Sequence, residues 1–586
     1  MNSRILITFI FLFTLNSCVE RRDLSINTVV NHITIQPDGL HPFNDNSSIR
    51  SFVFQYTQKS LTKLDLATLE YIPLLAKELA LISEDGLAYT YELRDGITWD
   101  DGTPLTAKDI EFSTKVMLCP LTNNAQIRSN YSSVIKSVEI DKDNPLKFTM
   151  YAHDVNYTNS NIFSELYIQQ KNYWDPEGVL DKLSFKDIFA GKFKETKELT
   201  DWFNSYNDGD NSYKPHLLQG LGAYQVTEWV AGQYITIEKK ENWWGVNDTS
   251  IYSSAFPDKI IFKIITDDAA SYLALKSEDI DVTTRIGTVK LLKLQERDYF
   301  NENYDSDFLN QYSFSYIGLN MKPDGIKHLP FFIDQKVRRA MAYLTPVDEI
   351  IEVIVHGKAS RQASNISSLK STYNDTLQLI PLDINKANEL LTEAGWIDTD
   401  GDNIRDKMIN GVKTPFSFKL SYMSSPVSKE IVLMIKESLY KAGLVAEPTP
   451  MDFTLFYKNA MDHNFDAMMG GWGGSASYSN PMQLWHTSSW ATKGSNFCGF
   501  GDAESDSLIY LANRSIDYKK HKDALWALQA KIYNDQPYVF LYSTKRKFAI
   551  HKRFNNREMY FERPGVMLNR LDLLPNYGAN NLNFTE

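Results

Sequence analysis

The chain has 586 residues, of which 13% are aromatic, and a formal net charge of −12 at pH 7. Nucleic-acid binders usually present a basic face, so this acidic balance weighs against that class. The aromatic content weighs against a disordered chain, and the length exceeds one ordinary core, so we expect two or three packed domains.

The N-terminal segment has the pattern of an export signal. Arg4 precedes an apolar run over residues 5–15, which is shorter than the roughly 20 residues of a membrane span but matches a signal-peptide core. The sequence Leu-Asn-Ser-Cys then ends at Cys18 and resembles the bacterial lipobox, where a diacylglyceryl thioether forms on the cysteine. This pattern predicts a signal peptide over 1–17 and a lipidated tether over 18–24, on an extracytoplasmic protein anchored to a membrane. The alternative is an ordinary signal peptide with a chance cysteine.

Two further cysteines, Cys119 and Cys498, are too few for a metal cluster of the CxxC type. Outside the cytoplasm they could form one disulfide. Two buried free thiols fit the sequence equally well.

The first half of the chain alternates between strand and helix signals. Asp85-Gly86 is a hairpin turn, and Thr106 caps a helix in which Asp109 is the third residue, close to a capping box. The further elements expected here are strands around 224–226, 235–237 and 259–265, a helix over 267–275 and a strand that starts at 279.

The second half is richer in helices. We expect a helix over 334–344 capped by Asp334, and another that starts at Thr345-Pro346, with proline in its first position, and stops at Gly357. Further helices are expected over 383–395, 428–443 and 523–534, and a buried strand over 538–542. The alternation along the whole chain indicates mixed α/β domains.

Several blocks, read in order, resemble the extracellular solute-binding protein family 5, the peptide-binding type of ABC importer receptor. The longest block contains Glu84-Asp-Gly86, Leu93-Arg-Asp-Gly96 and the run from Trp99 to Ala107. The other blocks are 220–224, 242–244, 280–281, 332–341, 387–406 and 529–542. Because they cover essentially the whole mature chain, the chain is identified as a member of this family.

The resemblance implies an α/β fold of the periplasmic-binding-protein type II class, with two lobes around a ligand cleft and an additional third domain, the cluster C type. Lobe I is expected to be discontinuous, and hinge motion is expected to close the lobes around the ligand. The expected parts are lobe I over 25–70, 217–305 and 545–586, domain II over 71–216, lobe III over 306–544, and hinge segments over 312–320 and 538–547.

The function that the resemblance implies is solute capture for import, with a small peptide ligand and an ABC permease in the membrane as partners. It implies a monomer without a cofactor, and no nucleic acid. The same fold could instead serve a metal chelate, haem or a sugar, or a sensing role at the surface. An uncharacterised hydrolase is a further alternative, although no HExxH, GxSxG or GxxxxGK[ST] motif occurs.

The resemblance also implies that a glycine-rich segment after Met468 faces the ligand cleft; the alternative is a surface loop with a core tryptophan. Trp472 offers an apolar wall, and the glycines around it let backbone groups approach a ligand closely. Peptide-binding relatives often carry an aspartate three residues after this tryptophan, where it pairs with the ligand's α-amino group. Here that residue is Ser475, whose hydroxyl is a weaker partner for an amino group. Ser477, Asn480 or an acid from elsewhere could take that role instead. The expected ligand-binding residues are Gly39, Leu40, His41, Tyr316, Asn320, Trp472, Gly473, Ser475, Tyr478 and Asn480.

An acidic turn is a minor candidate for a calcium site. Asp398, Asp400 and Asp402 could offer oxygen ligands. The EF-hand pattern requires glycine at position six, and here Gly401 stands at position four. The alternative is an ordinary turn after a helix.

Overall fold

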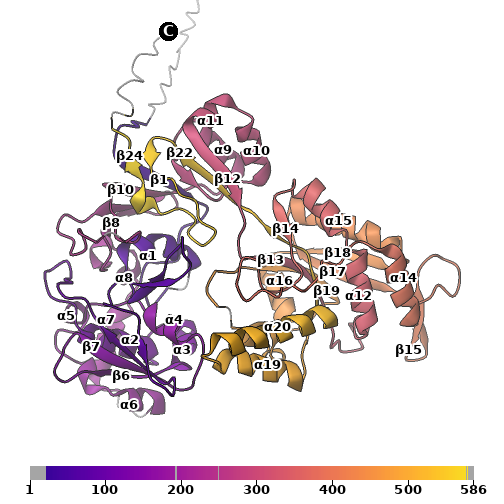
Figure 1. Ribbon diagram of the computed structural model, residues 1–586, viewed down its shortest axis with the longest axis horizontal. Helices are drawn as coiled ribbons and strands as arrows, with labels where there is room; N and C mark the ends of the chain where they lie inside the picture. Colours follow the sequence, from indigo (N-terminus) through magenta and orange to yellow (C-terminus); the bar gives the residue numbers. More distant parts are fainter. Residues whose placement is uncertain are drawn as a thin grey trace, which may run out of the picture.

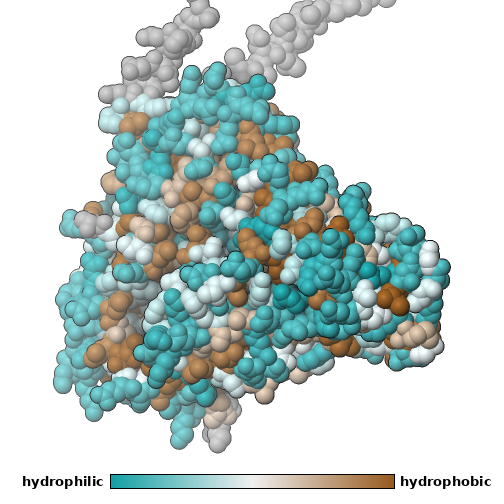
Figure 2. All heavy atoms as spheres, turned by 45° about the vertical axis from the view of Figure 1, so that its right-hand side comes forward, coloured by the Kyte–Doolittle hydropathy of each residue, from teal (hydrophilic) through white to brown (hydrophobic). Residues whose placement is uncertain are grey.

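The computed structural model describes residues 22–575 and residue 577, apart from residues 46, 192–194, 249 and 479. The predicted signal peptide and Cys18 lie outside the described residues. Within them, no helix combines the length and hydrophobicity that a membrane span needs. The face in Figure 2 is mostly hydrophilic, and its hydrophobic residues lie in small separate groups, as is normal for a protein surface.

Lobe I is built on a seven-stranded sheet in the order β12-β22-β11-β1-β10-β9-β8 (Figure 1). Its central strand β1 is buried along nearly its whole length and runs parallel to β10, as expected of a strand covered on both faces. The strands are β1 (Thr28–Ile33), β8 (Tyr224–Val230), β9 (Tyr234–Lys239), β10 (Lys259–Ile264), β11 (Val282–Thr283), β12 (Tyr304–Leu309) and β22 (Arg546–His551). Around them lie η1 (Ser48–Arg50), α1 (Ser51–Thr57), α9 (Asp268–Lys276), α10 (Thr288–Gln295), α11 (Asp298–Asn303), η5 (Leu568–Arg570) and the strand pairs β2 (Thr62–Leu64) with β3 (Tyr71–Pro73) and β23 (Phe554–Asn555) with β24 (Asp572–Leu573).

Domain II contains an antiparallel four-stranded sheet in the order β4-β5-β7-β6. The capping box at the start of α2 is present: the Asp109 carboxylate accepts a hydrogen bond from the Thr106 N–H at 2.9 Å. The strands are β4 (Leu81–Ile82), β5 (Ala88–Glu92), β6 (Ile135–Ile140) and β7 (Lys147–Ala152). The helices are α2 (Ala107–Leu118), α3 (Ala125–Ser132), α4 (Asn159–Ser164), α5 (Lys171–Trp174), η2 (Leu180–Lys182), α6 (Phe185–Ala190), α7 (Lys197–Tyr206), α8 (Asp210–Tyr213) and η3 (Pro215–Leu217).

Lobe III has a five-stranded sheet in the order β18-β17-β19-β13-β20, with helices around it (Figure 1). Its strands are β13 (Phe314–Leu319), β17 (Ser417–Met423), β18 (Val445–Met451), β19 (Ala467–Trp472) and β20 (Tyr538–Phe540), and two smaller pairs join β14 (Ala359–Arg361) to β21 (Tyr542–Thr544) and β15 (Asp406–Ile409) to β16 (Val412–Pro415). The helical segments are α12 (Gln335–Leu344), α13 (Val347–Glu349), η4 (Ile350–Ile354), α14 (Ile384–Glu393), α15 (Pro426–Tyr440), α16 (Phe453–Met461), α17 (Met482–Trp485), α18 (Thr487–Ala491), α19 (Ala503–Arg514) and α20 (Tyr518–Asp535).

Two connections join the sheets of lobe I and lobe III. One leads from β12 to β13, and the other leads from β20 through β21 to β22. The strand expected over 538–542 is interrupted at Leu541, whose N–H donates to the Ser315 carbonyl, and β21 then leaves the large sheet to pair with β14. The expected limit of lobe I at 305 is also wrong, because β12 pairs with β22 as far as Leu309. The remaining domain boundaries stay predictions.

Three predicted helix starts need correction. Pro346 is the N-cap and not the first helical residue, and a π-helical segment, η4, follows the short α13. Helix α15 starts at Pro426 because Ser425 accepts a hydrogen bond from the Ser428 N–H. Helix α20 starts at Tyr518, where Asp517 caps the Lys520 N–H.

Cys119 and Cys498 are free and buried, in the separate cores of domain II and lobe III. Burial raises the pKa of Cys119 to about 11. The free-thiol alternative therefore holds.

A buried ion cluster joins the start of the described chain to its C-terminal part. The Asp281 carboxylate contacts the Arg553 guanidinium at 2.8 Å and the Arg22 guanidinium at 2.5 Å, and it accepts a hydrogen bond from the Val30 N–H at 2.7 Å. The side chains of Asp281 and Arg553 are both fully buried. The first described residue is thus fixed to the central sheet of lobe I.

Candidate functional site

Two adjoining cavities lie where lobe I, domain II and lobe III meet. The larger has a volume of about 1160 Å³, and its walls come from domain II, from the loop before β3 and from lobe III. The smaller has a volume of about 330 Å³, and its walls come mainly from lobe I. The two share Leu64 and Ser477, so one ligand could occupy both.

Strand β19 brings Trp472 to the larger cavity. Its backbone is paired with Phe314 of β13, its indole N–H donates to the Tyr538 hydroxyl at 3.4 Å, and its ring stacks on Phe497 at 5.6 Å. The chain then passes close to the first hinge connection at Gly474, where an added Cβ would lie 2.3 Å from the Tyr312 carbonyl oxygen. Only glycine fits there, so the glycine-rich sequence serves a close backbone approach. Gly473 also lines the larger cavity.

Tyr478 and Asn480 lie at the end of the larger cavity where domain II meets lobe III. The Tyr478 hydroxyl donates to Asn513 Oδ1 at 2.6 Å, and Asn513 Nδ2 donates to Asn480 Oδ1 at 2.9 Å. From domain II, the Tyr157 ring stacks on the His521 ring with their centres 3.7 Å apart. The backbone N–H of Tyr157 donates to the Asn513 carbonyl at 2.6 Å. Domain II and lobe III are therefore in direct contact in this structure.

The segment 475–477 lies between the two cavities, where all three parts of the molecule reach it. The Ala476 N–H donates to the Glu562 carboxylate of lobe I, and Lys370 of lobe III donates to the Ser477 carbonyl at 2.6 Å. The Ser477 hydroxyl is 3.4 Å from the Tyr71 hydroxyl, which in turn donates to Glu165 of domain II at 3.1 Å. Ser475 itself lines the smaller cavity.

Lys370 provides a pH-dependent prediction. Burial lowers its pKa to about 8, and the charge of Glu562 opposes that shift. An unfolded lysine titrates near its ordinary value of about 10.4, so between these values the native state binds fewer protons than the unfolded state and stability rises with pH. We expect the unfolding free energy of the wild type, minus that of Lys370→Met, to increase from pH 8 to pH 10 in urea titrations. A difference that stays constant over this window would contradict the low pKa.

The first-loop residues do not reach either cavity. Leu40 is part of the lobe I core, and an added Cβ on Gly39 would collide with the Asp45 carboxylate. His41 is 1% exposed, packs edge-on against Tyr206, and its Nδ1 accepts backbone N–H groups. Burial lowers the pKa of His41 to about 3, so the ring is neutral. The predicted contacts by these three residues are therefore replaced by a packing role.

Tyr316 and Asn320 are also buried away from the cavities. Tyr316 on β13 stacks on Tyr538 of the neighbouring strand at 3.8 Å. Asn320 donates from Nδ2 to the Phe465 carbonyl at 2.8 Å. Both stabilise the lobe III sheet beside the hinge, and the contacts expected of them are corrected accordingly.

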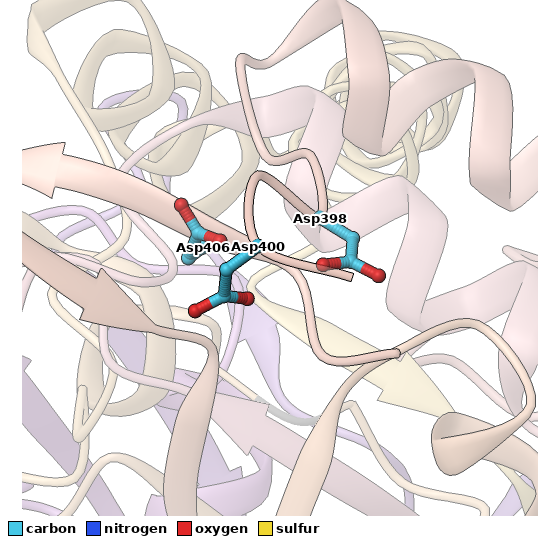
Figure 3. A group of neighbouring side chains, drawn as sticks. All are labelled: Asp398, Asp400 and Asp406. Atoms are coloured by element: carbon cyan, nitrogen blue, oxygen red, sulfur yellow. The ribbon is translucent and has the colours of Figure 1, made fainter. Parts of the chain in front are cut away.

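The acidic turn groups Asp398 and Asp400 with Asp406, whereas Asp402 is not in the group (Figure 3). Ligand oxygens of the three grouped residues lie within 4.8 Å of one another. However, the Lys413 ammonium already lies 2.5 Å from Asp400 and 3.4 Å from Asp406. Asp398 caps the turn by accepting from the N–H groups of residues 401 and 403. The turn alternative accounts for these contacts.

The sequence pattern did not indicate the charged residues of the smaller cavity. Lys59, Lys63, Glu165, Arg285, Glu562 and Arg563 line it together. They come from segments hundreds of residues apart, and none belongs to a motif. The one signal in the sequence was the expected return of the C-terminal segment, residues 545–586, to lobe I, which brings Glu562 and Arg563 there.

The family model "Bacterial extracellular solute-binding proteins, family 5 Middle" matches residues 70–495. Oligopeptide-binding protein AppA of Bacillus subtilis is 27% identical over 521 residues, covering 87% of this chain and 84% of that protein. Heme-binding protein A of Haemophilus influenzae is 23% identical, covering 78% of this chain and 76% of that protein.

Two solved structures share the fold. AppA of Bacillus subtilis in complex with a nonapeptide superposes with a TM-score of 0.69 at 23% identity, covering 94% of this chain and 99% of that one. NikZ of Campylobacter jejuni in complex with Ni(L-His) gives a TM-score of 0.70 at 20% identity, covering 93% and 99%. At these identities the likeness shows the fold alone.

Proposed function

Because the chain belongs to the bacterial extracellular solute-binding proteins of family 5, we propose that it captures peptides outside the cytoplasm and delivers them to an ABC permease. The family consists of binding proteins and not of enzymes. The observation that carries the proposal is the larger cavity between domain II and lobe III. Its volume of about 1160 Å³ exceeds the range of about 300–1,000 Å³ that is usual for a small-molecule pocket.

The lining of the larger cavity suits an extended ligand of varied side chains. Trp472 and Tyr478 offer flat apolar surfaces, while Gly473 and Gly474 leave backbone groups accessible. The names of relatives such as the oligopeptide-binding protein AppA support a peptide ligand. Closure by hinge motion at the two connections between the lobes would enclose the ligand.

A metal chelate or haem is the alternative ligand class, because relatives include a heme-binding protein and a structure with Ni(L-His). Of the described residues that line the two cavities, His521 is the single histidine, and its Nδ1 is bonded to the Ala512 carbonyl. This lining gives a metal few direct ligands, which favours the peptide.

Native mass spectrometry of the protein purified without its first 18 residues tests the ligand class. We expect masses of mixed peptides to travel with the protein, and calorimetry to reproduce their binding. A bound chelate, haem or sugar would refute the proposal, and so would the absence of binding to a broad peptide pool.

We also infer that Cys18 carries a lipid that anchors the receptor to a membrane. The lipobox-like sequence ending at Cys18 supports this inference. Substitution Cys18→Ala is expected to move the protein from the membrane fraction to the soluble fraction. A variant that remains in the membrane fraction, as the wild type does, would contradict lipid anchoring at this residue.

A further inference from the structure

Cationic side chains from three distant segments meet on the smaller cavity. Lys59 and Lys63 come from the segment between α1 and β2 and from β2 itself, Arg285 follows β11, and Arg563 lies near the C-terminal end. The whole chain carries a net charge of −12, so this local excess of positive charge is not a general property of its surface.

The two carboxylates on the same cavity are already engaged. Glu562 accepts hydrogen bonds from the Ala476 N–H and, at 2.7 Å, from the backbone N–H of Arg563. Glu165 accepts from the Tyr71 hydroxyl. Burial lowers the pKa of Lys59 to about 7, and its ammonium donates to the Tyr252 carbonyl. The three other cations, Lys63, Arg285 and Arg563, therefore face two carboxylates whose oxygens serve other donors.

The guanidinium groups of Arg285 and Arg563 lack polar partners in the described part of the chain. Among the residues that the structure describes, none forms a hydrogen bond or an ion pair with the guanidinium of Arg285 or Arg563. Arg285 is placed by the Phe52 ring, which lies 5.2 Å from its Cζ.

We propose that the smaller cavity is an anion subsite, in which Arg285 and Arg563 donate to a carboxylate of the bound ligand. The inference rests on the proposed peptide ligand and adds which of its chemical groups enters this cavity. Planar guanidinium groups match a carboxylate geometrically and form strong charge-assisted hydrogen bonds with it. A volume of about 330 Å³ holds one end of a ligand while the rest lies in the larger cavity.

The identity of residue 475 agrees with this assignment. Ser475 also lines the smaller cavity and brings no charge to it. A serine cannot neutralise an ammonium, and the cationic wall would repel it. The same two features that reject a positive ligand group favour a negative one.

Calorimetry with paired peptide pools tests the proposal. The probes are a mixed pentapeptide pool with free C-termini, the same pool as C-terminal amides, and an amide pool with aspartate at one position. We expect amidation to weaken binding about 10-fold or more, because it removes the charge-assisted hydrogen bonds to the free carboxylate. Rescue by aspartate would identify a side-chain carboxylate as the bound group. Equal binding of the free-acid and amide pools would overturn the anion subsite while leaving peptide binding intact.

Variants supply the second measurement. We expect Arg285→Met/Arg563→Met to remove the preference for the free acid without loss of melting temperature, since both residues are exposed and line the cavity. Arg297→Met is the matched control, because Arg297 is an exposed arginine of lobe I that lines neither cavity. If no peptide binds, the proposed function fails, and the melting temperature in succinate at constant ionic strength then tests the anion subsite by itself. Succinate should raise the melting temperature of the wild type but not that of the double variant. Identical shifts in the two proteins would overturn the proposal.

Discussion

Replacing Asp281 with asparagine is expected to lower the free energy of unfolding by about 3–5 kcal/mol, because the change leaves a buried guanidinium without its counter-charge. Asp281 and Arg553 are both fully buried and are joined at 2.8 Å. Arg22 supplies a second positive charge at 2.5 Å. Asparagine keeps the volume and some hydrogen bonds, so the loss reports the charge and not a cavity.

The pH dependence of this cluster has a definite sign. Burial opposes ionisation of Asp281, but the charges of Arg22 and Arg553 outweigh it and hold the pKa of the carboxyl below its ordinary value. A depressed native pKa gives stability that is present above the unfolded value of about 3.9. That stability is lost as pH falls through the pKa of Asp281 in the folded state. This group should therefore contribute to acid unfolding of the wild type only below about pH 4.

Chemical denaturation at pH 7 measures the effect, with Asp258→Asn as the matched control. Asp258 forms an exposed ion pair with Lys239 at 2.9 Å in the same lobe. Exposed pairs contribute about 0–1 kcal/mol, so the control should change little. Equal, small effects of the two substitutions would show that the buried cluster does not stabilise lobe I.

The second large effect is expected on ligand affinity, from Trp472→Ala. Trp472 ends β19, lines the larger cavity and is only partly covered by Phe497. Aromatic residues at the centre of a binding site contribute about 2 kcal/mol or more, which corresponds to a loss of roughly 30-fold in affinity. The melting temperature should fall far less than for a fully buried tryptophan.

Calorimetry with the peptide pool recovered from the native protein checks this prediction. Trp526→Ala is the control, because Trp526 is a half-buried tryptophan of lobe III on α20 that lines neither cavity. Unchanged affinity together with a large fall in melting temperature would identify Trp472 as a core residue.

Local signals in the sequence predicted most of the elements but not all of their ends. Asp334, Asp383 and the capping box at Thr106 mark their helices correctly, because a cap is a contact between neighbours in sequence. The starts of α15 and α20 were placed too late, since their caps precede the apolar pattern. The π-helical turn of η4 has no local sequence signal of this kind.

One part of the cavity lining comes from a single segment that the sequence could single out. The run after Met468, chosen for its glycines and by the family resemblance, brings Trp472, Gly473, Tyr478 and Asn480 to the larger cavity, and ligand contact by these residues stays a prediction. The smaller cavity joins residues as distant as Lys59 and Arg563, so no spacing along the chain could indicate it. His41 shows the converse: its loop is in the expected place, but its side chain is enclosed by the core.

The contact of Arg22 with Asp281 has a mechanical consequence. Force applied at Arg22 is transmitted through this contact to the seven-stranded sheet of lobe I. A receptor held by its N-terminal side therefore keeps lobe I stationary, and ligand closure becomes a displacement of lobe III. On a sensor surface, N-terminal immobilisation should leave closure unhindered, and a fluorophore on lobe III would report the full movement.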